Sequence, residues 1–216
     1  MIVAKFIAAA IAAYLLGSVP FGLIISKVKG GIDIREQGSG KTGATNVMRA
    51  FGIRLGLLTI ILDVIKAAVA VVLAKVIVGG SFLPLGSIFL NWQVAQVIAG
   101  LAALAGHNWP AFARFKGGRG VTAYFGTLFA IFPPAGILGT EVLAISALGS
   151  RYMSLGSILG ALAAWCLMVP LTIAYDFPPI YLAYSLAAIG LVVYQHRDNI
   201  SRLRHGTERR LGEKSL

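Results

Sequence analysis

Long apolar stretches separated by short polar segments run along the whole chain. The stretches without Asp, Glu, Lys or Arg include 6–26, 76–113, 152–175 and 177–194. About 20 apolar residues are enough for a helix to cross a hydrocarbon core ~30 Å thick. The pattern therefore predicts membrane spans over Phe6–Ser26, Leu55–Val78, Gly86–Ala105, Tyr152–Tyr175 and Phe177–Tyr194, with a turn at 79–81.

The stretch from Gly120 to Gly149 carries Pro133 and Pro134 at its middle. It forms either one kinked span or two short spans of about 13 residues, each roughly 20 Å long as a helix. Because Lys and Arg collect in cytoplasmic loops, the charge distribution distinguishes the two possibilities. With two spans, 16 of the 19 basic residues fall on one side of the membrane; they lie in 27–54, 106–119, 149–151 and the tail from 196.

We therefore predict an all-α polytopic membrane protein with seven transmembrane helices, two of them short, in one domain over residues 1–216. The N-terminus is expected outside and the C-terminus in the cytoplasm. Composition agrees and excludes a soluble enzyme: 57% of residues are apolar, the mean hydropathy is +0.82 and only 12% are charged, against about a quarter in soluble domains. The net charge of +11 is assigned to the cytoplasmic loops rather than to nucleic-acid binding. The lone Cys166 excludes a disulfide and is expected to serve packing.

The first basic loop has the composition of a phosphate site. Its glycines, among them Gly38 and Gly40, allow consecutive backbone N–H groups to turn toward one point, as in an anion-binding nest. Residues 44–51 are expected to form a short helix whose N-terminus adds its dipole. Arg49, one turn into that helix, can bind an anion through two N–H groups. A flexible polar loop is the alternative.

The tripeptide Gly40-Lys41-Thr42 in this loop imitates the end of a nucleotide-binding P-loop. That motif requires a first glycine where this chain has Arg35, and it follows a buried strand rather than a membrane span. We therefore exclude nucleotide hydrolysis.

The second basic loop repeats the same chemistry. Lys116-Gly117-Gly118-Arg119-Gly120 places two cations among glycines, directly before the span expected to start at Val121. This arrangement again suits a phosphate group. The alternative is a basic flank that anchors the span. Trp109 and Phe112 are interpreted as interfacial anchors, and His107 is left unassigned.

The third polar segment, His196–Glu208, follows the last predicted span. His196 and Asn199 are three residues apart and share a helical face at the cytoplasmic end of that span. Alone, the segment is typical of a basic tail that binds anionic lipid headgroups; beside two phosphate-type loops, it can supply a histidine to a shared site. Asp63 and Lys66, three apart inside the second span, either brace the wall of this site or neutralise each other.

Five elements together resemble the bacterial acyl-phosphate-dependent glycerol-3-phosphate acyltransferases, a family of small polytopic membrane enzymes. They extend over nearly the whole chain and are Gly17–Gly22, Asp33–Asn46, Leu62–Lys66, Lys116–Val121 and His196–Glu208. The chain departs from the family pattern at two positions, with Lys41 in place of Asn and Arg119 in place of Lys. Both departures keep or add positive charge, so phosphate binding is retained.

The resemblance implies transfer of a fatty acyl group from an acyl phosphate to the 1-hydroxyl of sn-glycerol 3-phosphate, which gives lysophosphatidic acid and phosphate in the first acylation of phospholipid synthesis. The residues fit this implication independently. Two phosphorylated substrates need a site with several cations, and a donor that is half lipid explains the membrane. An activated mixed anhydride needs no acyl-enzyme, and the sequence has no Gly-x-Ser-x-Gly elbow.

The resemblance also implies roles. Ser39 and the backbone of Gly38–Asn46 hold the donor phosphate, whereas Arg49, Lys116 or Arg119, His196 and Asn199 hold glycerol 3-phosphate. The hydroxyl proton goes either to His196 or to a substrate phosphate oxygen. The expected catalytic residues are His196, Asn199 and Ser39, and the supporting residues are Asp33, Arg35, Asp63 and Lys66. The expected substrate-binding residues are Gly38, Ser39, Gly40, Lys41, Thr42, Gly43, Thr45, Asn46, Arg49, Lys116, Gly117, Gly118, Arg119, Gly120, His196 and Asn199.

No cofactor, metal or nucleic acid is implied. The expected partners are acyl phosphate, glycerol 3-phosphate and membrane lipid, and a soluble acyl-phosphate synthase is a further candidate. The expected location is the bacterial inner membrane, with the active site facing the cytoplasm. The competing hypotheses are a transporter or channel for organic phosphates, whose site would lie near the midplane between repeats, and a non-enzymatic lipid-binding scaffold.

Overall fold

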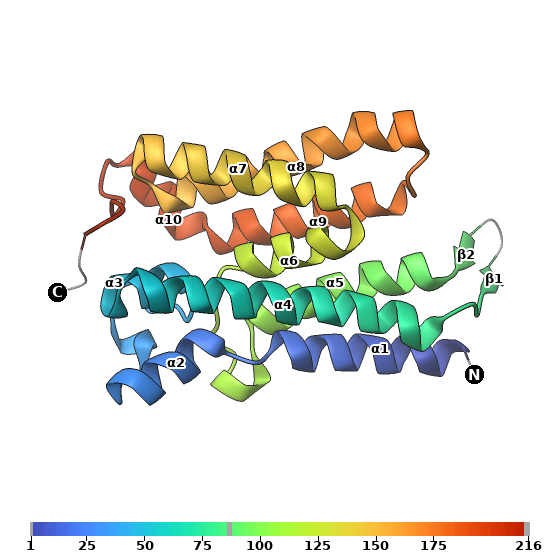
Figure 1. The fold of residues 1–216 in the computed structure, drawn as a ribbon, viewed down its shortest axis with the longest axis horizontal. Coiled ribbons are helices and arrows are strands. Elements are labelled where there is room, and N and C mark those ends of the chain that lie inside the picture. The colour runs from blue at the N-terminus through green and yellow to red at the C-terminus, as the bar shows by residue number, and fades with distance from the viewer. Residues whose placement is uncertain (1, 86–87, 214–216) are drawn as a thin grey trace.

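Helices running in similar directions form an elongated bundle in the computed structural model (Figure 1). The structure describes residues 2–85 and 88–213. The helices along the bundle are α1 (Ile2–Gly17), α4 (Ile53–Val78), α5 (Trp92–Asn108), α6 (Val121–Ile131), α7 (Pro133–Ser150), α8 (Met153–Tyr175) and α9 (Ile180–Gln195). Short 3-10 turns cover Ile34–Glu36 and Ala111–Ala113.

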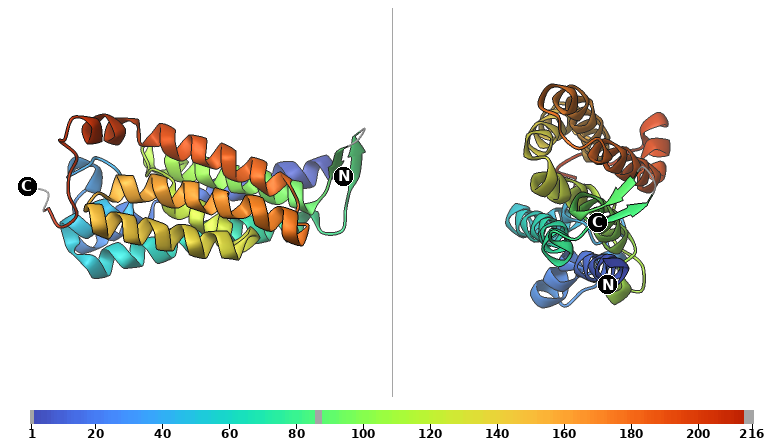
Figure 2. Two further views of the ribbon diagram at one scale, coloured as in Figure 1. Left: turned by 90° about the horizontal axis from the view of Figure 1, so that it is seen from above. Right: turned by 90° about the vertical axis from the view of Figure 1, so that its right-hand side faces the viewer.

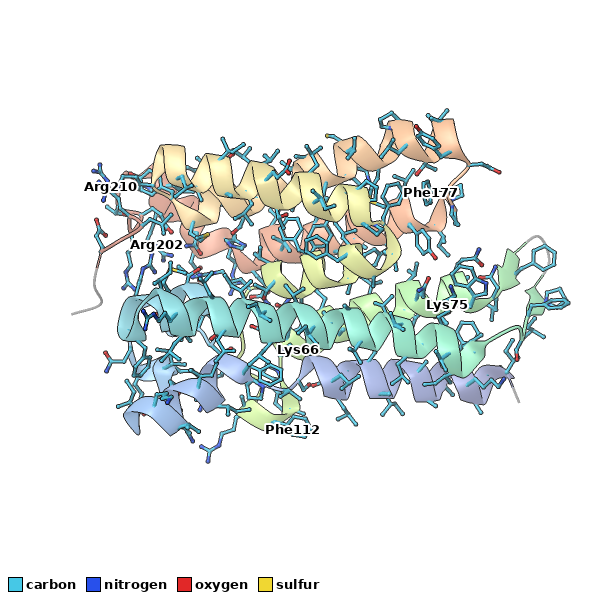
Figure 3. All side chains as sticks on the ribbon, viewed as in Figure 1. Lys66, Lys75, Phe112, Phe177, Arg202 and Arg210 are labelled. Carbon is cyan, nitrogen blue, oxygen red and sulfur yellow. The ribbon has the colours of Figure 1, made fainter. Side chains whose placement is uncertain are left out.

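The two ends of the bundle differ. The short helices α2 (Phe21–Gly30), α3 (Ala44–Phe51) and α10 (Arg197–Arg204) lie at one end, next to the turn between α7 and α8. An antiparallel hairpin of β1 (Leu83–Leu85) and β2 (Ile88–Leu90) lies at the other end, near the N-terminus. Three of the four basic segments that the charge pattern assigns to one side of the membrane, 27–54, 149–151 and the tail from 196, therefore gather at the end with α3 and α10. The fourth, 106–119, lies further along the bundle, where Figure 3 shows Phe112.

The short helix α6 occupies the middle of the bundle. In Figures 1 and 2, α1, α4 and α5 lie on one side of it and α7, α8 and α9 on the other. The largest cluster of buried apolar side chains surrounds α6 and includes its Tyr124, Phe125 and Leu128, with Val71 of α4 and Met168 of α8. Burial of such side chains at the meeting point of both halves stabilises the placement of every helix that α6 contacts.

Small residues let the helix backbones approach closely. A Cβ on Gly156 would lie 2.6 Å from the Leu143 carbonyl oxygen, and a Cβ on Gly160 would overlap the Gly139 carbonyl oxygen, so α7 and α8 pack backbone to backbone. Close approach of this kind replaces the hydrophobic driving force that is missing between helices in lipid.

The break at the two prolines is confirmed. Helix α6 ends at Ile131 and α7 begins at Pro133, where a proline is tolerated because the first helical N–H has no partner to lose. With 18 residues, α7 is longer than the roughly 13 residues expected for each half.

The first predicted span is not one continuous helix, and in this respect the prediction is wrong. Helix α1 ends at Gly17, and α2 starts only at Phe21. Pro20 lacks an N–H group and disfavours helical backbone at Val19, which favours a break at this point. The Val19 carbonyl, freed by the break, accepts a hydrogen bond of 2.7 Å from Lys66 Nζ on α4.

The predicted start of the third span is also wrong. Helix α5 begins at Trp92, because the Asn91 side chain accepts from the backbone N–H groups of Gln93 and Val94 at 3.0 and 3.2 Å and so caps the helix. The preceding residues pair as a hairpin, with Leu83 opposite Leu90. The start predicted at Gly86 lies outside the described residues.

Three segments of the described chain are long and apolar enough to cross a membrane: Ile2–Gly30, Ile53–Val78 and Met153–Tyr175. Val121–Ile131 and Ile180–Gln195 are shorter apolar helices. The count of seven transmembrane helices and their orientation stay predictions.

Candidate active site

An ion pair braces the loop between α2 and α3. The Asp33 carboxylate accepts from the backbone N–H of Arg35 at 3.0 Å and contacts its guanidinium at 2.6 Å. The hydrogen bond from Arg35 lowers the pKa of Asp33 to about 2, so the pair is charged at neutral pH. Arg35 Nη1 also donates to the Ala113 carbonyl at 2.7 Å. The pair therefore ties this loop to the segment that follows α5.

The Asn46 side chain fixes the shape of the same loop. Its Nδ2 donates to the carbonyls of Ile34, Gln37 and Lys41, each at 3.0 Å, and its Oδ1 accepts from the Ser39 N–H at 3.1 Å. Both ends of the amide are used inside the loop. The Asn46 side chain thus acts as a scaffold for the loop whose backbone is expected to bind the donor phosphate.

Hydrogen bonds within the protein engage part of the predicted nest. Gly38 and Gly40 do adopt positive φ, 55° and 68°, which favours glycine. However, the N–H groups of Ser39, Gly40 and Thr42 donate to Asn46 Oδ1, the Gln37 carbonyl and the Gly117 carbonyl. The N-terminus of α3, from Gly43 to Thr45, lines the neighbouring cavity instead, and a helix N-terminus is itself an anion-binding element.

A cavity of about 540 Å³ lies beside these loops. Its polar lining comes from the loop before α3, α3 itself, the start of α6, α8 and the α9–α10 region, and includes Ser39, Lys41, Thr45, Arg49, Arg119, Ser154, His196, Asn199 and Arg202. Its apolar lining comes from α4, α6 and α7 and includes Ile60, Val64, Val121, Phe125, Phe129 and Leu143. One space therefore joins a cationic region to an apolar one.

Most of the predicted site residues meet at this cavity. The predicted residues that line it are Gly38, Ser39, Lys41, Gly43, Thr45, Asn46, Arg49, Arg119, Gly120, His196 and Asn199. Gly40, Thr42, Lys116, Gly117 and Gly118 do not line it, nor do the four supporting residues. The sequence left Lys116 and Arg119 as alternatives. Lys116 is exposed, and Arg119 is the one that reaches the cavity.

The cavity holds positive charge in excess. Burial, and after it the nearby Arg202, lower the pKa of Arg119 to about 10, which leaves the guanidinium protonated at neutral pH. Burial also lowers the pKa of Lys41 and of Arg49. Among the described residues, the buried Nε atoms of Arg49 and Arg119 have no hydrogen-bond partner. Buried donors on cations are costly unless an anion accepts from them, so the site is suited to a multiply charged anion.

His196 is held as a neutral acceptor at the end of α9. Its side chain is buried, and its Nδ1 lies 2.8 Å from the Val192 carbonyl oxygen. Because a carbonyl only accepts, Nδ1 carries the proton and Nε2 keeps a lone pair. Burial lowers the pKa of His196 to about 4, so the ring is neutral at cytosolic pH. Such a ring can accept a hydrogen bond from a substrate hydroxyl.

Glu208 organises the polar end of the cavity, a role the sequence did not assign. Its carboxylate accepts from Ser154 Oγ at 2.9 Å, from Asn199 Nδ2 at 2.6 Å and from Arg202 Nε at 2.8 Å. The amide nitrogen of Asn199 is thereby occupied, and Asn199 Oδ1 has no partner among the described residues. These partners lie on α8 and α10, which sequence reasoning could not bring together.

Arg202 is a second residue that the sequence analysis missed. It follows Asn199 by three residues on α10, so both lie on one helical face. Figure 3 shows Arg202 at the end of the bundle with α10. The spacing from His196 through Asn199 to Arg202 was the available signal, and it was obscured by the other basic residues of the tail.

Asp63 and Lys66 form a buried pair outside the cavity. Their charged atoms are 2.8 Å apart, and Lys66 also donates to Val19. Of the two alternatives for this pair, the structure shows mutual neutralisation, since neither residue lines the cavity. Lys66 has a further role that the sequence did not predict, because it bonds the Val19 carbonyl at the break between α1 and α2. His107, unassigned from sequence, lines the cavity and places Nδ1 3.7 Å from the Asp63 carboxylate.

Comparison with known proteins gives consistent matches over nearly the whole chain. A family model described as glycerol-3-phosphate acyltransferase matches residues 7–206. Glycerol-3-phosphate acyltransferase 3 of Dehalococcoides mccartyi is 48% identical over 215 residues, 100% of both chains. Glycerol-3-phosphate acyltransferase of Halalkalibacterium halodurans is 38% identical over 204 residues, 94% of both chains.

A solved structure matches as well. The crystal structure of PlsY (YgiH), an integral membrane glycerol 3-phosphate acyltransferase, in its glycerol 3-phosphate form superposes with a TM-score of 0.82 at 36% identity and covers 96% of each chain. Its lysophosphatidic acid form gives a TM-score of 0.81 at 35% identity, over 96% of this chain and 95% of that one.

Proposed function

The chain belongs to the glycerol-3-phosphate acyltransferase family, and from this premise we propose that it transfers a fatty acyl group from an acyl phosphate to the 1-hydroxyl of sn-glycerol 3-phosphate. The products are lysophosphatidic acid and inorganic phosphate. One observation carries the proposal: a single cavity joins a cationic region to an apolar wall, and in the described residues the buried Nε atoms of its Arg49 and Arg119 have no hydrogen-bond partner. Substrates that carry phosphate at one end and an acyl chain at the other fit both regions.

The cations divide between two phosphate groups. Arg49, Arg119 and Asn199 hold the phosphate and hydroxyls of glycerol 3-phosphate, whereas Ser39 and Lys41, with the N-terminus of α3, hold the donor phosphate. The acyl chain lies along the apolar lining from α4, α6 and α7. The exposed Lys116 has no contact in this scheme. The support for these assignments is the shared cavity and the buried, unpaired guanidinium nitrogens.

The reaction itself needs one displacement. The hydroxyl oxygen of glycerol 3-phosphate bonds to the acyl carbon, and the bond from that carbon to the phosphate oxygen breaks, so phosphate leaves with the electron pair. The surrounding cations stabilise the charge that develops on the departing phosphate. An acyl phosphate is activated already, so no covalent acyl-enzyme is required.

The hydroxyl proton ends on the released phosphate. His196 Nε2 accepts a hydrogen bond from the hydroxyl and orients it toward the acyl carbon. With a pKa of about 4, His196 does not keep a proton at neutral pH, whereas phosphate groups titrate near pH ~6. The histidine therefore positions and polarises the nucleophile, and the leaving group is the final base.

Purified protein in detergent is expected to release inorganic phosphate when acyl phosphate and glycerol 3-phosphate are supplied together. Either substrate alone is expected to give only background release, because transfer needs the acceptor hydroxyl in place. Phosphate release and the formation of acylated glycerol phosphate are measured in the same samples.

Two outcomes would contradict the proposal. A transporter or a lipid-binding scaffold would release no phosphate in detergent, since a transporter needs two compartments. Equal rates with long-chain acyl-CoA in place of acyl phosphate would overturn the donor assignment, because the cavity residues bind phosphate and the chain lacks a nucleotide-binding pattern.

We further propose that the end with α3 and α10 faces the cytoplasm. A single cysteine placed at Asp176, in the turn between α8 and α9, is expected to react with a membrane-impermeant thiol reagent in intact cells. A cysteine at Gly206, after α10, is expected to react only after permeabilisation. Both sites are exposed. The exposed native Cys166 is replaced by alanine in both variants, so that it adds no signal. Labelling of position 206 in intact cells would contradict the seven-span topology.

A further inference from the structure

A buried polar cluster behind the cavity is not used by the reaction. Asp63, Lys66 and His107 are 2%, 6% and 5% exposed, and Figure 3 shows Lys66 within the bundle. Lys66 is engaged by Asp63 at 2.8 Å and by the Val19 carbonyl at 2.7 Å. His107 is the member that touches the active-site cavity, and its Nδ1 faces Asp63 at 3.7 Å. The cluster therefore places a buried imidazole ring at the wall of the active site.

The other side of that ring packs against the backbone of Gly118. A Cβ on Gly118 would overlap His107 Nε2, and its next contacts would be His107 Cδ2 at 2.9 Å and Cε1 at 3.1 Å. All three of the nearest atoms belong to this one imidazole. The Gly118 N–H also donates to the His107 carbonyl at 3.1 Å. Gly118 thus contacts both the backbone and the side chain of His107.

The flanking glycines rest on the same turn of α5. Gly117 donates to the Asn108 carbonyl at 3.2 Å, and a Cβ on Gly117 would overlap the His107 carbonyl oxygen. A Cβ on Gly120 would lie 2.8 Å from Asn108 Oδ1. Arg119 stands between two glycines that are packed on His107 and Asn108, and it alone of the segment's two cations lines the cavity. The last turn of α5 is therefore the surface on which the Arg119 segment is shaped.

We propose that His107 is a positioning residue for Arg119: its imidazole, buried beside Asp63, supports Gly118 and so sets where the Arg119 guanidinium meets the substrate phosphate. The proposal rests on the proposed function in one respect, the phosphate ligand of Arg119. It assigns His107 no contact with the reacting atoms. The requirement for glycine at 118 follows directly, because the space of a Cβ is filled by the ring.

A double-mutant cycle between His107→Ala and Gly118→Ala tests this coupling. We expect a loss in kcat/KM of ~10-fold for His107→Ala and ~100-fold for Gly118→Ala, and only ~10-fold for the double variant, because removing the ring makes room for the Cβ and contacting residues are not additive. The losses are expected in the KM for glycerol 3-phosphate, with the KM for the acyl donor unchanged, since a displaced Arg119 weakens binding of a group that does not react.

Gly117→Ala is the matched control. Its Cβ would meet backbone oxygens of His107 and Asn108, which His107→Ala leaves in place. The loss for His107→Ala with Gly117→Ala should therefore equal the product of the single losses. The proposal would be overturned if the loss in kcat/KM for the double variant at 107 and 118 also equalled the product of the two single losses. It would also be overturned if these variants lowered only kcat and kept a normal KM for glycerol 3-phosphate.

Folding and function are kept separate in this design. If His107→Ala does not yield a monodisperse protein in detergent, His107→Asn replaces it in the same cycle, because Asn retains a polar group near Asp63 and lacks the end of the ring that meets Gly118. Inactive wild-type protein would contradict the proposed function. If the wild-type protein is active but the losses at 107 and 118 simply multiply, only the role of His107 is contradicted.

Discussion

Replacing His196 with alanine is expected to lower the kcat of acyl transfer by at least ~100-fold, the size of effect typical for losing one positioned group at the reacting centre. The variant loses the Nε2 acceptor that orients the glycerol hydroxyl, while the cations that bind both phosphates remain. The KM values for both substrates are therefore expected to change little. The rate of phosphate release under saturating substrates measures the effect.

The pH dependence of the loss checks the cause. Because burial lowers the pKa of His196 from 6.5 to about 4, the ring is neutral above that value, and it loses its acceptor only as the pH falls through about 4. The ratio of wild-type to variant rate should be constant between about pH 6 and pH 8, and the substrates' own titrations cancel in it. If the ratio of wild-type to variant rate instead fell as the pH was lowered, with a midpoint near pH 6.5, the assignment of a buried, neutral histidine would be wrong. Cys166→Ala, on the exposed surface, is the control that should leave the rate unchanged.

Replacing Arg49 with alanine is expected to lower kcat/KM for glycerol 3-phosphate by ~100-fold or more, because a charge-assisted contact to phosphate in a buried site contributes a few kcal/mol, and about 1.4 kcal/mol is a factor of ten. Its guanidinium lies on α3 at the wall of the cavity, and its buried Nε has no partner among the described residues. Initial rates at varied glycerol 3-phosphate separate KM from kcat.

Two further variants show whether position or charge matters. Arg49→Lys keeps the charge but loses the planar, paired donors, so it should recover only part of the activity. Arg54→Ala removes an exposed arginine five residues further along, at the start of α4 and outside the cavity, and should be close to wild type. Equal losses for Arg49→Ala and Arg54→Ala would mean that the general charge of this end of the protein, rather than a phosphate contact, is responsible.

Local patterns in the sequence predicted local structure well. The helix expected over residues 44–51 is α3, Ala44–Phe51. Its bounds could be predicted because Gly43 and Gly52 flank a short segment of mixed polar and apolar residues. The break at Pro133 was predicted for a similar reason, since two consecutive prolines disfavour the helical conformation of the residues before them. The meeting of the two basic loops with His196 and Asn199 followed from placing them on one side of the membrane.

The failures share another cause, which is that the deciding partner lies far away in the chain. Nothing within residues 6–26 shows that the helix breaks, because Pro20 is often accommodated in membrane helices, and Lys66, which satisfies the freed Val19 carbonyl, is 47 residues away. The glycine-rich loop is typical of a nest, but Asn46, Gln37 and Gly117 each accept a hydrogen bond from one of its backbone N–H groups. Composition cannot tell an amide that faces a ligand from one that faces the protein.

The bonding of Asn46 makes the loop sensitive to one chemical change. Deamidation is a slow chemical change that turns an asparagine into an aspartate of nearly the same shape. At this position, the new carboxylate would face the carbonyls of Ile34, Gln37 and Lys41 with no hydrogen to offer. The three carbonyls would then repel the side chain at position 46 that now holds the loop together, although the cations of the cavity would be unchanged. Asn46 is 2% exposed and lies in a helix, so the fold keeps water away from an amide on which the shape of the loop depends.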